Sequence, residues 1–178
     1  MIRHQFLREF KPTIFFLAKF IVFYLCGNLL YGWYVANWHP IVDPFTSEVA
    51  DQVSILLNFF GWETTVFNHA TRPTSNLVLN NQAILAIYEG CNGLNVGIVF
   101  IAFLLAFGPI SKKLYWFIPI GLLAIHLGNL LRVILLFLVS IKLPDFMYFA
   151  HKYLFTAFIY LVVFMLWIWW VRTITRKD

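Results

Sequence analysis

Four long apolar runs dominate this sequence and limit what the chain can fold into. They cover residues 14–36, 92–108, 114–139 and 153–171. A helix that crosses a bilayer needs about 20 mostly apolar residues, and each run meets or nearly meets that length. The composition agrees, since 61% of the 178 residues are hydrophobic and only 12% are charged. We therefore expect an all-α integral membrane protein, with residues 1–178 forming a single membrane domain of about four transmembrane helices.

Basic residues at the ends of these runs predict the orientation. They fall in three groups that an even number of spans places on one side of the membrane: Arg3, Arg8 and Lys11; Lys112 and Lys113; Arg172, Arg176 and Lys177. Cytoplasmic loops carry an excess of Lys and Arg, so we expect both termini in the cytoplasm of a multi-pass plasma (inner) membrane protein. These flanks also account for the net charge of +5, which makes the lipid bilayer, and not nucleic acid, the expected partner.

The segment from about residue 37 to 90 is expected to face outward. Asp43 and Pro44 are typical of a helix N-cap followed by proline at the first helical position. Apolar residues then recur at helical spacing, which predicts an amphipathic helix lying on the membrane surface or on the other spans. The runs TTVF, NLVL and AILAIY are separated by turn residues and predict short β-like strands. The last run leads directly into a cysteine.

That cysteine, Cys91, lies in the stretch YEGCNGLNV just before an apolar run. We expect it to open a helix with Asn92 as the N-cap, and Gly90 and Gly93 to let a substrate backbone approach closely. The other cysteine, Cys26, lies inside the first run and is expected to be a buried apolar thiol. The two are far apart and form no C-x-x-C, so neither a disulfide framework nor a zinc site is indicated, and no cofactor is expected.

Three polar residues from different runs are predicted to reach the same depth. With a helical rise of about 1.5 Å per residue, Cys91, Arg132 and His151 lie roughly 26–30 Å above the inner ends of their spans. Each has a plain alternative: a small buried thiol, an arginine that snorkels to the headgroups, and an interfacial histidine. Together they supply the parts of an acyl-transfer site, namely a thiol nucleophile, a general acid/base and a cation for an oxyanion.

Other polar residues are candidates for supporting roles. Asn129 lies one turn below Arg132, where it can orient Arg132 or His151 or hold two helices together. The remaining histidines to consider are His39, His69 and His126. The first two are further candidates for the base, whereas the third lies deeper and is expected to serve packing.

The order and spacing of these residues resemble the exosortase/archaeosortase family of membrane cysteine transpeptidases. The family pattern has C-[S/A/N]-G opening one membrane helix, N-x-x-R in the next, and a histidine opening the one after. Here these stand as Cys91-Asn92-Gly93, Asn129 to Arg132, and His151. The resemblance covers about residues 81–170, and the short chain looks like the small exosortase-F type. Many members have more spans, and Asn92 stands where serine or alanine is commoner.

The resemblance implies a peptidase or transpeptidase on the outer face of the plasma membrane. Its substrates would be exported proteins that end in a short motif, a membrane span and a basic tail, and the acyl group would pass to an acceptor amine. The implied roles are Cys91 as nucleophile, His151 as acid/base, Arg132 as oxyanion or substrate stabiliser, and Asn129, Asn92 and Gly93 as supporting residues.

Three other functions remain open from the sequence. A non-enzymatic membrane scaffold or assembly protein would not need Cys91. A four-span thiol oxidase would need paired outer cysteines, and Cys91 has no outer partner. A small transporter would place polar residues along a path through the bilayer midplane, whereas here they cluster at one surface.

Overall fold

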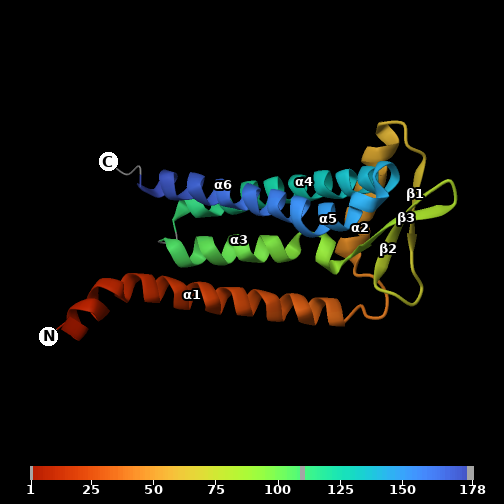
Figure 1. The fold of residues 1–178 in the computed structure, drawn as a ribbon. Helices are drawn as coiled ribbons and strands as arrows, with labels where there is room; N and C mark the ends of the chain where they lie inside the picture. Colours follow the sequence, from red (N-terminus) through yellow and green to blue (C-terminus); the bar gives the residue numbers. More distant parts are fainter. Residues whose placement is uncertain (1, 109–110, 176–178) are drawn as a thin grey trace.

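The computed structural model describes residues 2–108 and 111–175, so the basic residues Arg176 and Lys177 lie outside it. Four helices run side by side, and a small sheet lies at one end of them (Figure 1). They are α1 (Ile2–Ala36), α3 (Leu94–Phe107), α4 (Lys112–Lys142) and α6 (Phe155–Thr175). Helix α1 packs on α3, while α3, α4 and α6 pack on one another. Helix α1 begins and α6 ends at the end of the bundle opposite the sheet (Figure 1).

Three helical segments are long and apolar enough to cross a bilayer: Phe10–Ala36, Lys112–Lys142 and Pro144–Thr173. They contain the first, third and fourth expected spans. The expected second span is the shorter apolar helix α3, which has 14 residues. At about 1.5 Å per residue it reaches roughly 21 Å, less than the hydrocarbon core of about 30 Å. Helix α3 is short because Gly93 before it is left-handed, with φ 85°, and Gly108 after it is extended.

The surface of α1 is largely uncovered by the rest of the chain. None of its most apolar window is buried, and Leu29, Leu30 and Trp33 are each about 70% exposed. Helix α1 meets α3 at Gly27, where a Cβ would lie 2.6 Å from a side-chain carbon of Ile98. The adjacent Cys26 is exposed, so the expectation of a buried thiol is wrong. Its place on an apolar, uncovered helix surface fits contact with lipid.

The segment from residue 37 to 90 folds into a helix and a sheet, as the sequence predicts. Helix α2 (Pro44–Phe59) begins after Asp43, whose side chain accepts a hydrogen bond from the Thr46 backbone N–H at 3.0 Å. Strands β1 (Thr64–Asn68), β2 (Thr74–Leu79) and β3 (Gln82–Tyr88) form an antiparallel sheet in the order β1-β2-β3. The fold is therefore mostly helical, with long apolar helices and with the expected short strands paired into one small sheet.

This helix and sheet share a hydrophobic core with the C-terminal half of α4. Buried residues from α2, β2, β3 and α4 contribute to it: Val49, Val53, Leu57, Leu77, Ile87, Val133 and Phe137. Helix α2 packs on all three strands and on α4. Residues 37–90 are thus packed on the helix bundle. Strand β3 belongs to this packed unit, and Cys91 follows three residues after its end.

Candidate active site

Cys91 lies between the end of β3 and the start of α3. The chain passes through a 3₁₀ turn, Glu89–Cys91, and α3 begins only after Gly93, which occupies the N-cap position with φ 85°. The expectation that Cys91 opens the helix with Asn92 as N-cap is therefore wrong, because glycine alone adopts this left-handed conformation without strain. The Asn92 Oδ1 still accepts a hydrogen bond from the Leu94 backbone N–H, at 2.9 Å.

The thiol of Cys91 faces the imidazole of His151. The Cys91 Sγ lies 3.7 Å from the His151 Nε2. His151 belongs to a π-helical turn, Ala150–Leu154, between α5 (Met147–Phe149) and α6. Such turns insert an extra residue into a helix and often occur at functional sites. The Thr156 hydroxyl donates to the backbone oxygen of His151 at 3.1 Å, which satisfies one carbonyl of this irregular turn.

Arg132 is buried beside these two residues without a partner of its own. Its side chain is 7% exposed, so it does not snorkel toward the surface. Its Nε has no hydrogen-bond partner, and no carboxylate in the described part of the chain forms an ion pair with it. A buried cation without a partner is costly. Arg132 is therefore available to a carbonyl, oxyanion or carboxylate of a bound molecule.

Asn129 holds the backbone of Cys91 by a hydrogen bond. It is fully buried, and its Nδ2 donates to the Cys91 backbone oxygen at 2.9 Å. A Cβ on Gly93 would lie 3.1 Å from the Asn129 Cγ, so this amide already fills the space beside Gly93. The structure thus connects Asn129 to the Cys91 backbone, which fits the expected role of holding two parts of the bundle together better than the alternative of orienting Arg132 or His151.

Tyr88 is a site residue that the sequence analysis missed. Its ring lies beside Gly90, where a Cβ would stand 2.5 Å from the Tyr88 Cε2, so the absence of a side chain at this glycine leaves space for the ring. The Tyr88 hydroxyl and backbone N–H both favour the thiolate of Cys91 by hydrogen bonding. The only sequence signal was that a tyrosine ends the strand-like run before the cysteine.

The environment of Cys91 favours the neutral thiol over the thiolate. Burial raises the pKa of the Cys91 thiol above its ordinary value, and the Arg132 charge and the Tyr88 hydrogen bonds offset this only in part. The pKa of Tyr88 is also raised, first by the neighbouring Cys91 and then by burial, so the hydroxyl remains a donor. A thiol that ionises reluctantly needs a base within reach to react as a nucleophile, and the His151 imidazole lies 3.7 Å from this one.

Asn92, which follows Cys91, links the turn before α3 to helices α1 and α2 by hydrogen bonds. Its Nδ2 donates to the Tyr31 hydroxyl of α1 and to the Thr46 Oγ1 of α2, both at 3.0 Å. The Tyr31 hydroxyl in turn donates to the Glu89 backbone oxygen at 2.9 Å. Asn92 is 1% exposed and has both ends of its amide engaged in these bonds. Its place in the fold is therefore structural.

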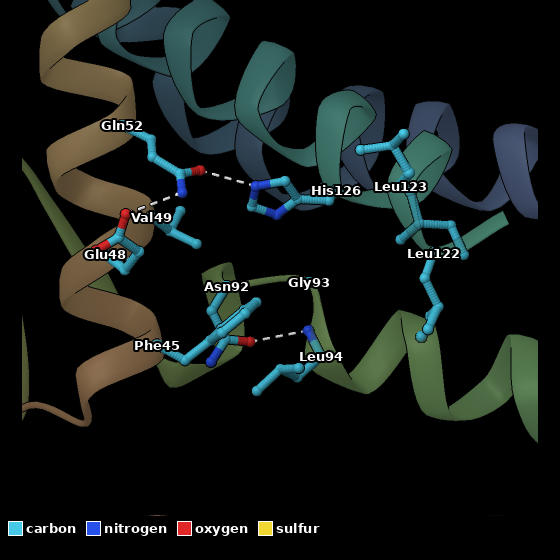
Figure 2. A pocket seen from close by; sticks show the side chains of 12 residues that line it. Phe45, Glu48, Val49, Gln52, Asn92, Gly93, Leu94, Leu122, Leu123 and His126 are labelled. Atoms are coloured by element: carbon cyan, nitrogen blue, oxygen red, sulfur yellow. Dashed lines mark hydrogen bonds between the residues drawn. The ribbon is translucent and has the colours of Figure 1, made fainter. Parts of the chain in front are cut away.

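His39, His69 and His126 do not hydrogen-bond to Cys91. The His126 Nε2 lies 2.8 Å from the Gln52 Oε1, while the Gln52 Nε2 donates to Glu48 at 3.0 Å. Figure 2 shows this chain of side chains bridging α4 and α2 beside an apolar recess of about 360 Å³. His69 accepts from the Thr71 N–H in the β1–β2 connection, and His39 lies in the loop before α2. His126 thus has the expected packing role.

A separate cavity of about 160 Å³ adjoins the thiol and the imidazole. Its walls come from β3, α4 and the segment before α6, and they include Leu85, Leu136 and Met147. In the described ranges, no group of three or more His, Cys, Asp and Glu side chains is placed to hold a metal ion. A thiol, a base, an unpartnered guanidinium and an apolar cavity together fit acyl transfer from an apolar peptide.

Comparison with known proteins gives no further assignment. No protein-family model, no curated protein and no solved structure matches this chain.

Proposed function

We propose that this chain is a membrane-embedded cysteine peptidase or transpeptidase that cleaves C-terminal sorting signals of exported proteins. Cys91 is the nucleophile, His151 the general acid/base, and Arg132 the group that stabilises the oxyanion or the substrate carbonyl. The resemblance to the exosortase/archaeosortase family, carried by Cys91-Asn92-Gly93, Asn129 to Arg132 and His151, supports the same function.

One observation carries the proposal. The Cys91 Sγ lies 3.7 Å from the His151 Nε2, and the buried, unpartnered Arg132 exerts its charge on that same thiol. A scaffold protein has no need to hold a cysteine, a histidine and a desolvated arginine together. A thiol oxidase needs a second cysteine, and both Cys26 and Cys91 are free.

The reaction follows from these positions. His151 takes the proton of the Cys91 thiol, and the sulfur attacks the scissile carbonyl carbon. The carbonyl oxygen becomes an oxyanion, which the Arg132 guanidinium stabilises through charge and hydrogen bonds. The carbon–nitrogen bond then breaks, and His151 returns its proton to the leaving amine. The products of this half-reaction are a thioester on Cys91 and a released C-terminal segment that carries the membrane span.

A second half-reaction restores the enzyme. An acceptor amine attacks the thioester, its proton passes through His151 to the departing sulfur, and a new amide bond forms. If water takes the place of the amine, the product is a free carboxylate and the enzyme is a peptidase. The chemistry of Cys91, His151 and Arg132 is the same in both cases.

The proposed placement has α1, α3, α4 and α6 in the bilayer with both termini in the cytoplasm. Three long apolar helices support a membrane location. The short α3 then reaches the outer surface through the Gly93 and Cys91 segment, which places the thiol at the outer boundary of the hydrocarbon layer. Helix α2 and the sheet lie outside, where exported substrates arrive.

Co-expression with a candidate substrate tests the proposal. The substrate is an exported chain of the same genome that ends in a short motif, an apolar span and a basic tail. Wild-type enzyme should release the C-terminal span, and Cys91→Ala and Cys91→Ser should leave the substrate uncleaved in the membrane, because a hydroxyl ionises far less readily than a thiol. Cys26→Ala is the matched control and should process normally. Normal processing by Cys91→Ala would refute the proposed nucleophile.

A further inference from the structure

Strand β3 has one edge that pairs with no other strand. The sheet order is β1-β2-β3, so β3 bonds to β2 on one side only. Among the described residues, no backbone–backbone hydrogen bond joins positions 82–88 to a segment outside the sheet. An edge strand of this kind carries a row of free N–H and C=O groups, which form a template for one more strand. This strand runs directly into the 3₁₀ turn that carries Cys91.

The cavity at the thiol reaches this free edge. It contacts the three successive residues Leu85, Ala86 and Ile87. Successive side chains of a strand point to opposite faces of the sheet. A cavity on one face would therefore contact every second residue, whereas a cavity that contacts three residues in a row lies along the edge of the strand. Because β2 occupies the other edge, the cavity lies along the free one. Cys91 and His151 line the same cavity.

We infer that the free edge of β3 binds the peptide substrate as an added strand, with the scissile carbonyl at Cys91. The inference rests on the proposed function and names the way in which that site recognises its substrate. Main-chain hydrogen bonds to an edge strand give affinity without demanding a particular sequence, and pockets for alternate side chains add selectivity. The occupant is the extended segment that precedes the scissile bond.

The direction of the added strand follows from the polarity of both chains. Strand β3 runs toward the helix bundle (Figure 1), and the turn that carries Cys91 follows it directly. In the proposed substrate, the residues before the scissile bond belong to the exported part, and the membrane span follows it. The substrate segment therefore also runs toward the membrane and pairs parallel with β3.

The cavity limits which side chains the substrate presents. Its walls are apolar, with Leu85, Val133, Leu136 and Met147 around a volume of about 160 Å³. Its lining contains no Asp or Glu side chain, so a basic substrate residue would be desolvated there without a partner. We therefore expect a substrate that places one apolar side chain of moderate size beside Cys91.

Peptide chloromethyl ketones test this inference without knowledge of the natural motif. The probe is an acetylated apolar pentapeptide, and its reaction forms a sulfur–carbon bond to Cys91 and releases chloride. Single N-methylation at each amide removes one donor at a time. If the peptide pairs with β3, labelling should slow about five- to tenfold at alternate amides only, as expected for one lost hydrogen bond. Equal effects at every amide, or none at any, would overturn the inference.

Two substitutions on β3 provide an independent check. Ala86 and Ala83 are both exposed on this strand, but only Ala86 contacts the cavity. Ala86→Trp should slow the pentapeptide probe at least about fivefold relative to iodoacetamide, a small reagent that needs no strand pairing. Ala83→Trp should leave that ratio unchanged. Equal ratios in both variants would argue against substrate binding along this edge.

The peptide probe distinguishes two outcomes: that the β3 edge does not bind the substrate, and that the proposed function is wrong. If labelling requires His151 but ignores the N-methylation pattern, the thiol site stands and the β3 edge is not the binding site. If replacing His151 with glutamine leaves both peptide and iodoacetamide labelling unchanged, the proposed function itself is wrong.

Discussion

The Asn129 side-chain amide holds the backbone of the proposed nucleophile, donating from Nδ2 to the Cys91 carbonyl oxygen at 2.9 Å. The contact joins α4 to the turn before α3, and Asn129 is fully buried. A neighbouring helix thus fixes the position of Cys91 relative to Arg132, which lies one turn further along α4.

Replacing Asn129 should affect both stability and labelling of the thiol. Asn129→Leu leaves the Cys91 carbonyl unsatisfied in a buried place, which should cost about 1–3 kcal/mol of unfolding free energy. Peptide labelling of Cys91 should also slow, because the turn is no longer held. Asn37→Leu is the matched control, since Asn37 makes the same type of bond to Trp33 on an exposed surface. Thermal unfolding in detergent measures the first effect, and equal losses in both variants would contradict it.

Tyr88 and Gly90 should act together on the ionisation of Cys91. The Tyr88 hydroxyl lowers the pKa of the Cys91 thiol, so Tyr88→Phe should move the pH profile of iodoacetamide alkylation to higher pH. Gly90→Ala should produce a similar shift, because the new Cβ displaces the Tyr88 ring. Gly32→Ala, at a glycine with open space around it, should leave the profile unchanged. An unchanged profile in Tyr88→Phe would show that the hydroxyl does not influence the thiol.

Arg132 should have two separable effects. Its charge lowers the pKa of Cys91, which burial raises, so Arg132→Met should shift alkylation to still higher pH and slow it at neutral pH. Arg132→Lys keeps the charge and should retain a profile near wild type. It should nevertheless lose most substrate cleavage, because lysine lacks the planar guanidinium fork. Arg72→Gln, on an exposed connection, serves as the control. Near-normal cleavage by Arg132→Lys would exclude the oxyanion role.

His126 should matter for stability and not for chemistry. Its bond to Gln52 links α4 to α2, so His126→Leu should lower the unfolding free energy by about 1 kcal/mol. The pH profile of Cys91 alkylation should remain that of wild type. A change in that profile without a loss of stability would place His126 in the reaction.

Much of the fold follows from short-range rules in the sequence. Asp43 and Pro44 predict the start of α2, and the alternation of apolar runs with turn residues predicts all three strands. Hydropathy locates the long helices. It overestimates α3, because the left-handed Gly93 delays the start of the helix beyond the first residues of the apolar run.

Some features of the site can be predicted from the sequence, and others cannot. Helical rise, counted from the inner ends of the runs, predicts that Cys91, Arg132 and His151 reach one depth. The structure brings the Cys91 Sγ and the His151 Nε2 within 3.7 Å and places the Arg132 charge close enough to act on the thiol. The 3₁₀ turn at Cys91 and the π-helical turn at His151 depend on tertiary packing and leave no local signal. The ring of Tyr88 beside Gly90 is a side-chain packing arrangement that no periodicity reveals. The partner of Asn129 is likewise set by how α4 lies against the turn before α3.

The most direct test of the central claim is the detection of an acyl-enzyme on Cys91. Wild-type protein is mixed with a candidate exported substrate, quenched in acid and analysed by mass spectrometry of the Cys91 peptide. We expect a hydroxylamine-sensitive adduct whose mass corresponds to the substrate up to its cleavage site, absent in Cys91→Ala and unaffected by Cys26→Ala. Cleavage of the substrate at a wild-type rate by Cys91→Ala, with no adduct on the wild-type peptide, would contradict it.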